Sequence, residues 1–364
     1  MHLEQLKLTQ FKNYESEHIQ FSAKVNCIVG LNGMGKTNLL DAIYYLCVCK
    51  SQFGILDRLL VQDAKDFFRL EGQFKKNSKA YKVIAKVQPR KLKEFSINGA
   101  THPKLANHIG QFPVVMITPF DIALAMDGSE VRRRFLDFSI SQMDSAYLSS
   151  LLKYNRVLRQ RNAALKSFTF PSINHSLLDS LEEQWKPLAQ EIFHKRVSFM
   201  ESFLPLFEKH YQKITNGQEE VQCTYKSSLL AFDFEAALLQ AREKDILLQR
   251  STVGIHKDDL LFTIKNRPLK KFASQGQLKS FILALKLAQY ELLSINLQIA
   301  PLLLLDDIFD RLDNHRVQQL VKLLFEQEFG QIFFTDTQPQ RLLKMITPFQ
   351  KDIAQFEISH GAII

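Results

Sequence analysis

Hydrophobic and polar residues alternate near the N-terminus and give way to continuous apolar runs further along the chain. The alternation over Leu6–Leu8 and Ile19–Phe21 predicts two short strands. Val25–Val29 and Val114–Ile117 are apolar almost throughout, which is typical of strands buried on both faces. Further strand-like segments are 68–74, 81–87, 94–97, 260–264, 301–305 and 331–335, and helical patterns cover 37–49 and 277–293.

Residues 130–245 have a different texture, with almost no glycine and with apolar side chains at helical spacing. This predicts a helical arm inserted between two α/β segments, with heptads too short and irregular for a long coiled coil. Strands alternate with helices on both sides of the arm, so the expected fold class is α/β with a covered sheet. We expect one domain to comprise residues 1–118 and 290–364, and the largely helical arm domain to comprise 119–289.

Charge and composition limit the kind of partner and the compartment. The chain has 47 Lys and Arg against 38 Asp and Glu, a formal net charge of +9. Such an excess favours nucleic acid or, less often, an anionic membrane surface as the binding partner.

The longest uncharged apolar runs, 42–49 and 299–305, are far below the ~20 residues that span a bilayer, and no signal peptide is visible. The four cysteines lack zinc spacing. We expect a soluble, cytoplasmic protein with reduced cysteines.

A glycine-rich segment between the strand 25–29 and the helix 37–49, called the phosphate loop below, carries the strongest chemical signal. It fits G-x-x-x-x-G-K-[ST] in full, with Gly30, Leu31, Asn32, Gly33, Met34, Gly35, Lys36 and Thr37. Glycines let backbone N–H groups curl around phosphates, and the helix N-terminus adds partial positive charge. The motif predicts that Lys36 contacts the β- and γ-phosphates of a nucleotide and that the Thr37 hydroxyl binds Mg²⁺.

Two acidic residues follow the apolar run Leu302–Leu305, at the strand end where α/β sheets bind ligands. Asp306 is expected to hold Mg²⁺ directly or through water, and Asp307 to orient or deprotonate the water that attacks the γ-phosphate. The catalytic candidates are therefore Lys36, Asp306 and Asp307.

A third motif precedes the helix 278–293. Ser274, Gln275, Gly276 and Gln277 resemble the signature motif of ABC-type ATPases, which implies that they bind a γ-phosphate held by the other subunit of a dimer. The order of the motifs agrees, because Ser274 lies 238 positions after Lys36 and 32 before Asp306. Leu312-Asp313 resembles the D-loop, so Ser274 and Asp313 are expected at a dimer interface.

A closer resemblance, nearly end to end, is to the RecF family of SMC-like bacterial DNA repair ATPases. The matching segments include 11–14, 32–38 with Asn38, 133–137, 160–162, 252–259, 273–277, 303–307 and 312–313. The sequence departs from the family pattern at Ile255, Lys257, Phe120 and Lys279, and it has no switch histidine around Thr335–Thr337. A Thr or Asp there is a candidate sensor of the γ-phosphate, and the departures put the roles of Asp121 and His256 in doubt.

The resemblance implies an ABC-type ATP-binding head, with ATP and Mg²⁺ as cofactors and an ATP-dependent homodimer that closes around DNA. It also implies slow, DNA-stimulated hydrolysis, and action with RecO and RecR at gapped or stalled-replication DNA to load RecA. These expectations come from the family and not from composition.

The candidate DNA-binding residues are cationic and belong to the arm: Arg132, Arg133, Arg134, Arg156, Arg159 and Arg161, with Lys153 or Lys166 beside them. Contacts to phosphates without base reading are expected. The alternative is a solvated helix face with intramolecular ion pairs to acids such as Glu130 and Asp137.

Two other classes of function stay open at this point. The ATPase subunit of a transporter predicts a signature about 100 residues after the phosphate loop and a switch histidine, and this chain has neither. A DNA-binding scaffold that binds ATP without useful turnover is disfavoured by Asp306 and Asp307, although a slow ATPase has the same sequence pattern.

Overall fold

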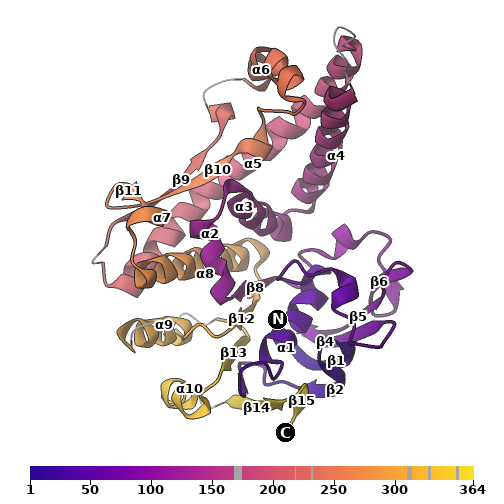
Figure 1. The fold of residues 1–364 in the computed structure, drawn as a ribbon. Coiled ribbons are helices and arrows are strands. Elements are labelled where there is room, and N and C mark those ends of the chain that lie inside the picture. The colour runs from indigo at the N-terminus through magenta and orange to yellow at the C-terminus, as the bar shows by residue number, and fades with distance from the viewer. Residues whose placement is uncertain (168–173, 218, 231–232, 310–313, 327–328, 350–351) are drawn as a thin grey trace. The chain divides into compact units, whose positions relative to one another are not determined.

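The computed structural model describes residues 1–167, 174–217, 219–230, 233–309, 314–326, 329–349 and 352–364. The chain forms two compact units (Figure 1). The first comprises residues 1–122, 209–218 and 274–364, and the second comprises 123–208 and 219–273.

The first unit contains an antiparallel sheet whose strands show the alternating burial expected of a sheet with one core face. Its order is β2-β1-β4-β5-β6-β7. The strands are β1 (His2–Phe11), β2 (Tyr14–Gln20), β4 (Phe68–Lys76), β5 (Lys79–Gln88), β6 (Leu92–Ile97) and β7 (Ala100–Thr101).

The other sheet of this unit positions the chemistry. Its order is β15-β14-β3-β13-β12-β8, and from β14 to β8 neighbouring strands are parallel. The strands are β3 (Val25–Val29), β8 (Val114–Ile117), β12 (Leu302–Leu305), β13 (Ile332–Asp336), β14 (Ile353–Ser359) and β15 (Ala362–Ile363). The continuous apolar runs predicted as buried strands are β3, β8 and β12, each buried throughout.

Helix α1 (Lys36–Val48) contacts strands of both sheets, namely β1, β4 and β5 of the first and β8 and β13 of the second (Figure 1). This explains why nearly all of its residues are buried, because a helix covered on both sides is apolar all round. The unit also holds α8 (Gln275–Leu297), α9 (Asn314–Glu326) and α10 (Pro339–Ile346).

The division of the chain differs from the boundaries expected at residues 118 and 289. Helix α8, placed in advance largely in the arm, belongs wholly to the first unit. The reason is packing: α8 contacts β8, and its Lys286 Nζ donates to the carbonyl of Met116 at 3.0 Å. The helix that follows the signature segment is therefore a layer on the parallel sheet.

The second unit is largely helical, as its sequence predicts. Its helices are α2 (Ala123–Met126), α3 (Ser129–Met143), α4 (Ser145–Ser167), most of α5 (His175–Thr215), α6 (Phe234–Leu248) and α7 (Leu269–Phe272). It also contains an antiparallel sheet, β11-β10-β9, of β9 (Val221–Lys226), β10 (Asp259–Ile264) and β11 (Arg267–Pro268). Strand β9 lies in the stretch expected to be helical, so that expectation is wrong there.

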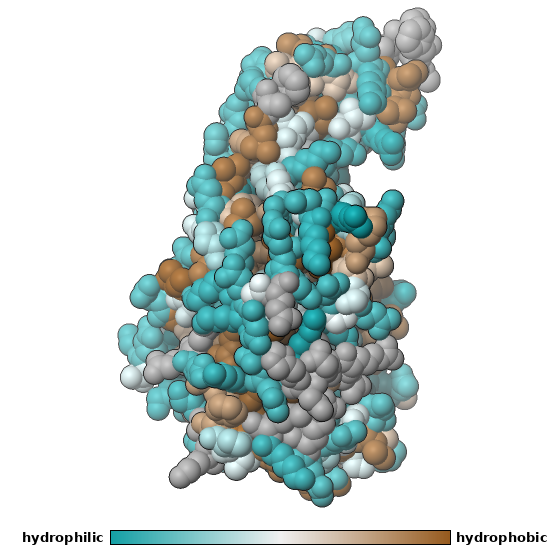
Figure 2. Space-filling model, turned by 90° about the vertical axis from the view of Figure 1, so that its left-hand side faces the viewer, coloured by the Kyte–Doolittle hydropathy of each residue, from teal (hydrophilic) through white to brown (hydrophobic). Residues whose placement is uncertain are grey.

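The face drawn in Figure 2 is mostly hydrophilic, and apolar residues on it form small scattered groups. In the part of the chain that the structure describes, no helix combines the length and apolarity needed to span a bilayer. Cys27, Cys47, Cys49 and Cys223 are buried free thiols, as the sequence predicts.

Candidate nucleotide-binding site

The glycine-rich segment forms the connection between β3 and α1. Gly30, Gly33 and Gly35 have φ values of 146°, 81° and 119°, a region that residues with a Cβ rarely adopt. Leu31, Asn32 and Gly33 at the crest are exposed, whereas Gly35 at the start of the helix is buried. The backbone N–H groups at the start of α1 lie directly behind this exposed crest, at a helix N-terminus of the kind where anions bind.

Lys36 lies beneath this loop and is only 4% exposed. Its Nζ donates to the carbonyl oxygens of Gly30 at 2.8 Å and Leu31 at 3.0 Å. An ammonium group has three protons, and these two contacts use two of them. Lys36 thus closes the loop on itself and keeps a donor for an anion bound in the loop.

Thr37, the next residue, meets the acidic end of β12. Its Oγ1 lies 2.9 Å from Oδ1 and 3.0 Å from Oδ2 of Asp306. The contact follows from topology, because β3, β13 and β12 are parallel neighbours whose carboxyl ends share one edge of the sheet. A hydroxyl and a carboxylate side by side form the hard oxygen donor set that suits Mg²⁺.

Strand β13 lies between these two elements and contributes Thr335, which the sequence presented as one of several γ-phosphate sensor candidates. Its Oγ1 donates to Asp306 Oδ1 at 2.8 Å and accepts the backbone N–H of Asp307 at 2.9 Å. Thr335 thereby joins the two acidic residues. Asp307 has φ 44°, a left-handed conformation that Asp and Asn tolerate better than most residues.

Asp306 is 3% exposed. The pKa of its carboxyl is raised to about 6 overall, chiefly by burial and also by the nearby Asp307, while the hydroxyls of Thr335 and Thr37 and the charge of Lys36 lower it. A buried carboxylate that is costly to ionise gains most from a cation placed against it.

The turn between β1 and β2 supports the phosphate loop, a role that its sequence did not reveal. Asn13 Nδ2 donates to the carbonyl of Met34 at 2.9 Å, and Tyr14 Oη donates to that of Gly35 at 3.0 Å. Asn38 Nδ2 donates to Asn13 Oδ1 at 2.7 Å. In this structure Asn38 contacts Asn13, so it supports the phosphate loop indirectly. The only advance signal was that both segments, 11–14 and 32–38, belong to the family resemblance.

The signature segment caps helix α8. The Ser274 side chain accepts from the Gln277 backbone at 3.2 Å, and the Gln277 side chain accepts from the Ser274 backbone at 2.7 Å. This capping box holds Ser274 and Gln275 in exposed positions at the helix N-terminus. Gly276 faces Arg316 of α9, whose Nη1 would lie 3.4 Å from a Cβ at that position. Asp313, the expected D-loop residue, lies outside the described residues.

Asp121, whose role was open, pairs with the helix after the signature segment. Its Oδ1 lies 2.7 Å from Lys286 Nζ, and its Oδ2 accepts from the Thr118 backbone at 2.7 Å. Both side chains are largely buried. Asp121 thus fixes α8 to the end of β8, which is a structural role.

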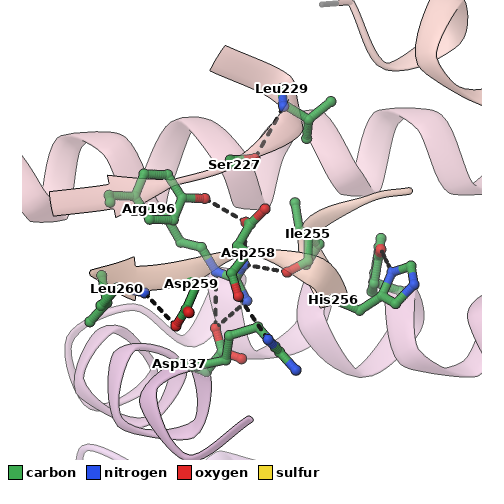
Figure 3. A network of polar contacts seen from close by, with 12 residues as sticks. Asp137, Arg196, Ser227, Leu229, Ile255, His256, Asp258, Asp259 and Leu260 are labelled. Atoms are coloured by element: carbon green, nitrogen blue, oxygen red, sulfur yellow. Dashed lines mark hydrogen bonds and ion pairs between the residues drawn. The ribbon is translucent and has the colours of Figure 1, made fainter. Parts of the chain in front are cut away.

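The run of three arginines at the start of α3 is largely occupied by partners within the second unit. Arg132 makes two parallel contacts to Asp259 of β10, at 2.6 and 3.0 Å. Arg133 donates to the carbonyl of Asp258 at 2.7 Å. Figure 3 shows this region, where Asp258 and Asp137 flank the buried Arg196 and each lies 2.7 Å from it. The ion-pair alternative thus describes Arg132, and it also describes Arg134, which is exposed and pairs with Glu130.

Arg161 is fully buried, so the expectation that it lies on an exposed face of α4 is wrong. It lies 2.7 Å from both Glu182 and Asp245 and donates to Ser251 Oγ at 2.8 Å. Its position follows from the helical period, because it comes four residues after the buried Val157. Arg156 and Arg159 are exposed on the opposite face of the same helix.

His256, which precedes the acidic pair Asp258-Asp259, orders its own loop. Its Nδ1 pairs with Tyr154 Oη at 2.8 Å and its Nε2 with the Ser251 carbonyl at 3.2 Å. Burial lowers the pKa of His256 to about 4, so the ring is neutral at physiological pH.

Comparison with known proteins places this fold and site. The sequence matches the family described as RecF/RecN/SMC N terminal domain over residues 2–351. It is 43% identical over 345 residues to the DNA replication and repair protein RecF of Flavobacterium johnsoniae, covering 94% of this chain and 95% of the relative. The chain belongs to the RecF family. The RecF of Bacteroides thetaiotaomicron is 41% identical over 364 residues, which are 100% of this chain and 98% of the relative.

Solved structures agree with the RecF assignment. The structure described as the recombination mediator protein RecF-ATP in the RecFOR pathway superposes with a TM-score of 0.89 at 27% identity, covering 100% of this chain and 97% of that one. An SMC head bound to the C-winged helix domain of ScpA matches with a TM-score of 0.59 at 15% identity over 100% and 96% of the chains, which shows a shared fold. The predicted class is confirmed: an SMC-like α/β ATPase head with a helical second unit and no long coiled coil among the described residues.

Proposed function

We propose that this protein is an ATP-dependent DNA-binding protein of recombinational repair and replication-fork maintenance. The observation that carries the proposal is the contact between Thr37 and Asp306 beside the phosphate loop. The relatives named RecF and the solved RecF-ATP structure support the same conclusion. In this proposal ATP binds between two copies of this chain.

The residues present suit ATP with Mg²⁺. The phosphate loop, 30–35, surrounds the phosphates with backbone N–H groups, and Lys36 contacts the β- and γ-phosphates. Thr37 and Asp306 would hold Mg²⁺, which would neutralise negative charge on the phosphates. The fit rests on the donor set, because a buried carboxyl with a raised pKa faces a hydroxyl at the end of a parallel sheet. Gln275, Gly276 and Gln277 complete the nucleotide contacts from the partner chain.

Asp307 is the proposed group that orients or deprotonates the attacking water. Its backbone is fixed through Thr335 to the same strand ends that carry Asp306, so the two carboxyl groups keep distinct positions. A carboxylate placed beside the γ-phosphate can accept a proton from water as the bond to phosphorus forms.

The dimer is proposed to form through the exposed signature segment. Ser274 and Gln275 lie at the N-terminus of the long helix α8, and their hydroxyl, amide and backbone N–H groups can meet a γ-phosphate bound to a second copy. Asp313 is proposed to cross the same interface.

The proposed DNA contact is the exposed face of α4. This helix contains no Asp or Glu, and Lys153, Arg156, Arg159 and Lys166 are all exposed. Within the described ranges, none of these four side chains forms an ion pair with a carboxylate. Arg159 Nε donates to the backbone carbonyl of Asn155 at 3.2 Å, which leaves its charge without a carboxylate. Cations without a carboxylate partner on a helix face are available to duplex or single-stranded phosphates irrespective of sequence. Arg134 can join them by exchanging its exposed ion pair, whereas Arg132 and Arg133 support the fold.

The family context completes the proposal. ATP closes two heads around gapped or junction DNA, slow hydrolysis releases them, and the partners RecO and RecR help to load RecA. The ATPase subunit of a transporter is the alternative function, and the full-length similarity to RecF proteins favours DNA repair over it.

ATP turnover and dimer mass, each measured with and without gapped duplex DNA, test this function. We expect ATP to promote dimerisation and DNA to stimulate turnover. Lys36→Ala should weaken ATP binding at least about 30-fold, because a hydrogen bond to a charged group contributes roughly 2 kcal/mol or more. DNA that leaves turnover unchanged would favour a scaffold without useful hydrolysis, and unchanged ATP affinity in Lys36→Ala would refute the site.

A further inference from the structure

The C-terminal hairpin, β14 and β15, lies directly against the phosphate loop. Strand β14 runs parallel to β3 with Glu357 paired to Val29, so the residues that follow, Ile358 and Gly30, are neighbours. A Cβ on Gly30 would lie 2.4 Å from the carbonyl oxygen of Ile358, too close for any side chain. The first glycine of the loop is therefore required by the approach of β14 as well as by its own backbone angle.

The two-residue turn of this hairpin reaches the other end of the loop. Ser359 pairs with Ala362, and His360 and Gly361 between them both have positive φ, at 49° and 79°, as in a type I′ turn. The Gly361 N–H donates to the carbonyl of Met34 at 2.9 Å, and the His360 N–H approaches the Met34 sulfur at 3.4 Å.

Met34 thus has two donors on one carbonyl, Gly361 N–H from the hairpin and Asn13 Nδ2 from the β1–β2 turn, each at 2.9 Å. The fit leaves no room, because a Cβ on Gly361 would lie 2.1 Å from the carbonyl oxygen of Asn13. In a planar trans peptide the C=O and the following N–H point in opposite directions. Holding the Met34 carbonyl outward therefore fixes the direction of the Gly35 N–H, one of the groups that a phosphate loop presents to its ligand.

We infer that the C-terminal hairpin is part of the nucleotide site and that Gly361 is a positioning residue for the phosphate loop. The inference rests on the proposed function, since it assumes that this loop binds the phosphates of ATP. Gly361 acts through Met34 and Asn13.

A matched control exists in the same chain. Asn98 and Gly99 form another two-residue turn, between β6 and β7, with φ values of 50° and 83°. No atom lies within 4 Å of a Cβ built on Gly99. Gly361→Ala and Gly99→Ala therefore impose similar backbone strain, but only the first forces the hairpin away from the loop.

The test measures ATP affinity by equilibrium titration and amide hydrogen exchange of the nucleotide-free protein for both variants. We expect Gly361→Ala to raise the Kd for ATP about tenfold over Gly99→Ala, as loss of a buried hydrogen bond predicts. Exchange should accelerate across residues 30–37 and stay unchanged in β3. Equal affinity and equal exchange in the two variants would overturn the inference.

Two further measurements keep the outcomes distinct. If Gly361→Ala fails to fold, Gly361→Asn and Gly99→Asn repeat the comparison, because Asn tolerates positive φ while the contact with Asn13 remains blocked. If the unmodified protein does not bind ATP, the proposed function fails, and hydrogen exchange alone still decides whether the hairpin holds the loop.

Discussion

The Thr37 hydroxyl lies 2.9 Å from Oδ1 of Asp306 although 269 positions separate the two residues in the sequence. They meet because β3 and β12 flank β13 in a parallel sheet, so the loop after β3 and the acid after β12 emerge at one edge. Thr335 at the end of β13 closes the group by contacting both Asp306 and Asp307. The site is thus held by three adjacent strand ends, a rigid base for groups that are proposed to meet a phosphate at fixed distances.

Replacement of Asp307 should separate binding from hydrolysis. Asp307→Asn keeps the side-chain shape and tolerates the left-handed backbone at φ 44°, so ATP affinity should be unchanged. Turnover should fall roughly 100-fold or more, because the variant lacks a carboxylate to handle water. Dimers with ATP should accumulate. Single-turnover hydrolysis and equilibrium titration check this together, and normal turnover would show that Asp307 is not the group acting on water.

The buried Asp306 predicts a pH dependence of stability. Burial raises its pKa from 3.8 to about 6, so between these values the folded chain keeps a proton that the unfolded chain has released. Stability conferred by the protonated form is therefore lost as pH rises through this window. Without nucleotide and Mg²⁺, Asp306→Asn should be more stable than the unmodified protein by up to about 3 kcal/mol above pH 6, with the difference vanishing near pH 4.

Chemical denaturation at a series of pH values measures this effect. Asp66→Asn, at an exposed position of the same unit, is the control and should change little. A stability difference for Asp306→Asn that does not vary between pH 4 and 7 would mean that Asp306 is ionised in the folded protein without cost.

DNA affinity should depend steeply on salt, with the exposed cations of α4 responsible for part of the slope. Changing Arg156, Arg159 and Lys166 together to Gln should reduce the slope of log K against log salt by up to about 3 units, since each duplex phosphate contact releases about 0.9 counterion. The control changes Lys79, Lys91 and Lys104 to Gln, which removes equal charge from exposed positions of the first unit. Equal slopes for the two triple variants would assign the α4 cations to a solvated face.

Local sequence patterns predicted the elements that fold for local reasons. The apolar runs at Val114–Ile117 and Leu302–Leu305 are strands, because burial on both faces requires continuous apolar residues. Strand β9 was missed because it lies within a long glycine-poor helical stretch and pairs only with β10, a contact between distant segments. The domain boundary was misplaced for a similar reason, since nothing in α8 itself shows that it packs on β8.

The residues of the site also differ in whether the local sequence could predict their positions. The motif itself predicted Lys36 and Thr37, and the acids after an apolar strand predicted Asp306 and Asp307; the structure brings Thr37 and Asp306 together. The prediction for Arg161 was wrong because a charged residue is usually exposed, whereas here two buried carboxylates balance the charge of the buried guanidinium group. The support from Gly361 was invisible, because a glycine near the C-terminus carries no signal of what its N–H contacts in the folded chain.

Mixing two inactive variants tests most directly whether ATP binds between two chains. Lys36→Ala lacks phosphate contacts, and Ser274→Arg blocks closure at the signature segment. In a mixed dimer one site carries both defects and the other carries none, so an equal mixture should recover up to about a quarter of normal ATPase sites. A linked dimer that carries both changes in one of its halves has no intact shared site, so it should be inactive if sites are shared and active if each chain uses its own. ATP shared between two chains predicts recovery in the mixture. No recovery, with mixed dimers present by mass and a singly mutated linked dimer active, would contradict a shared site.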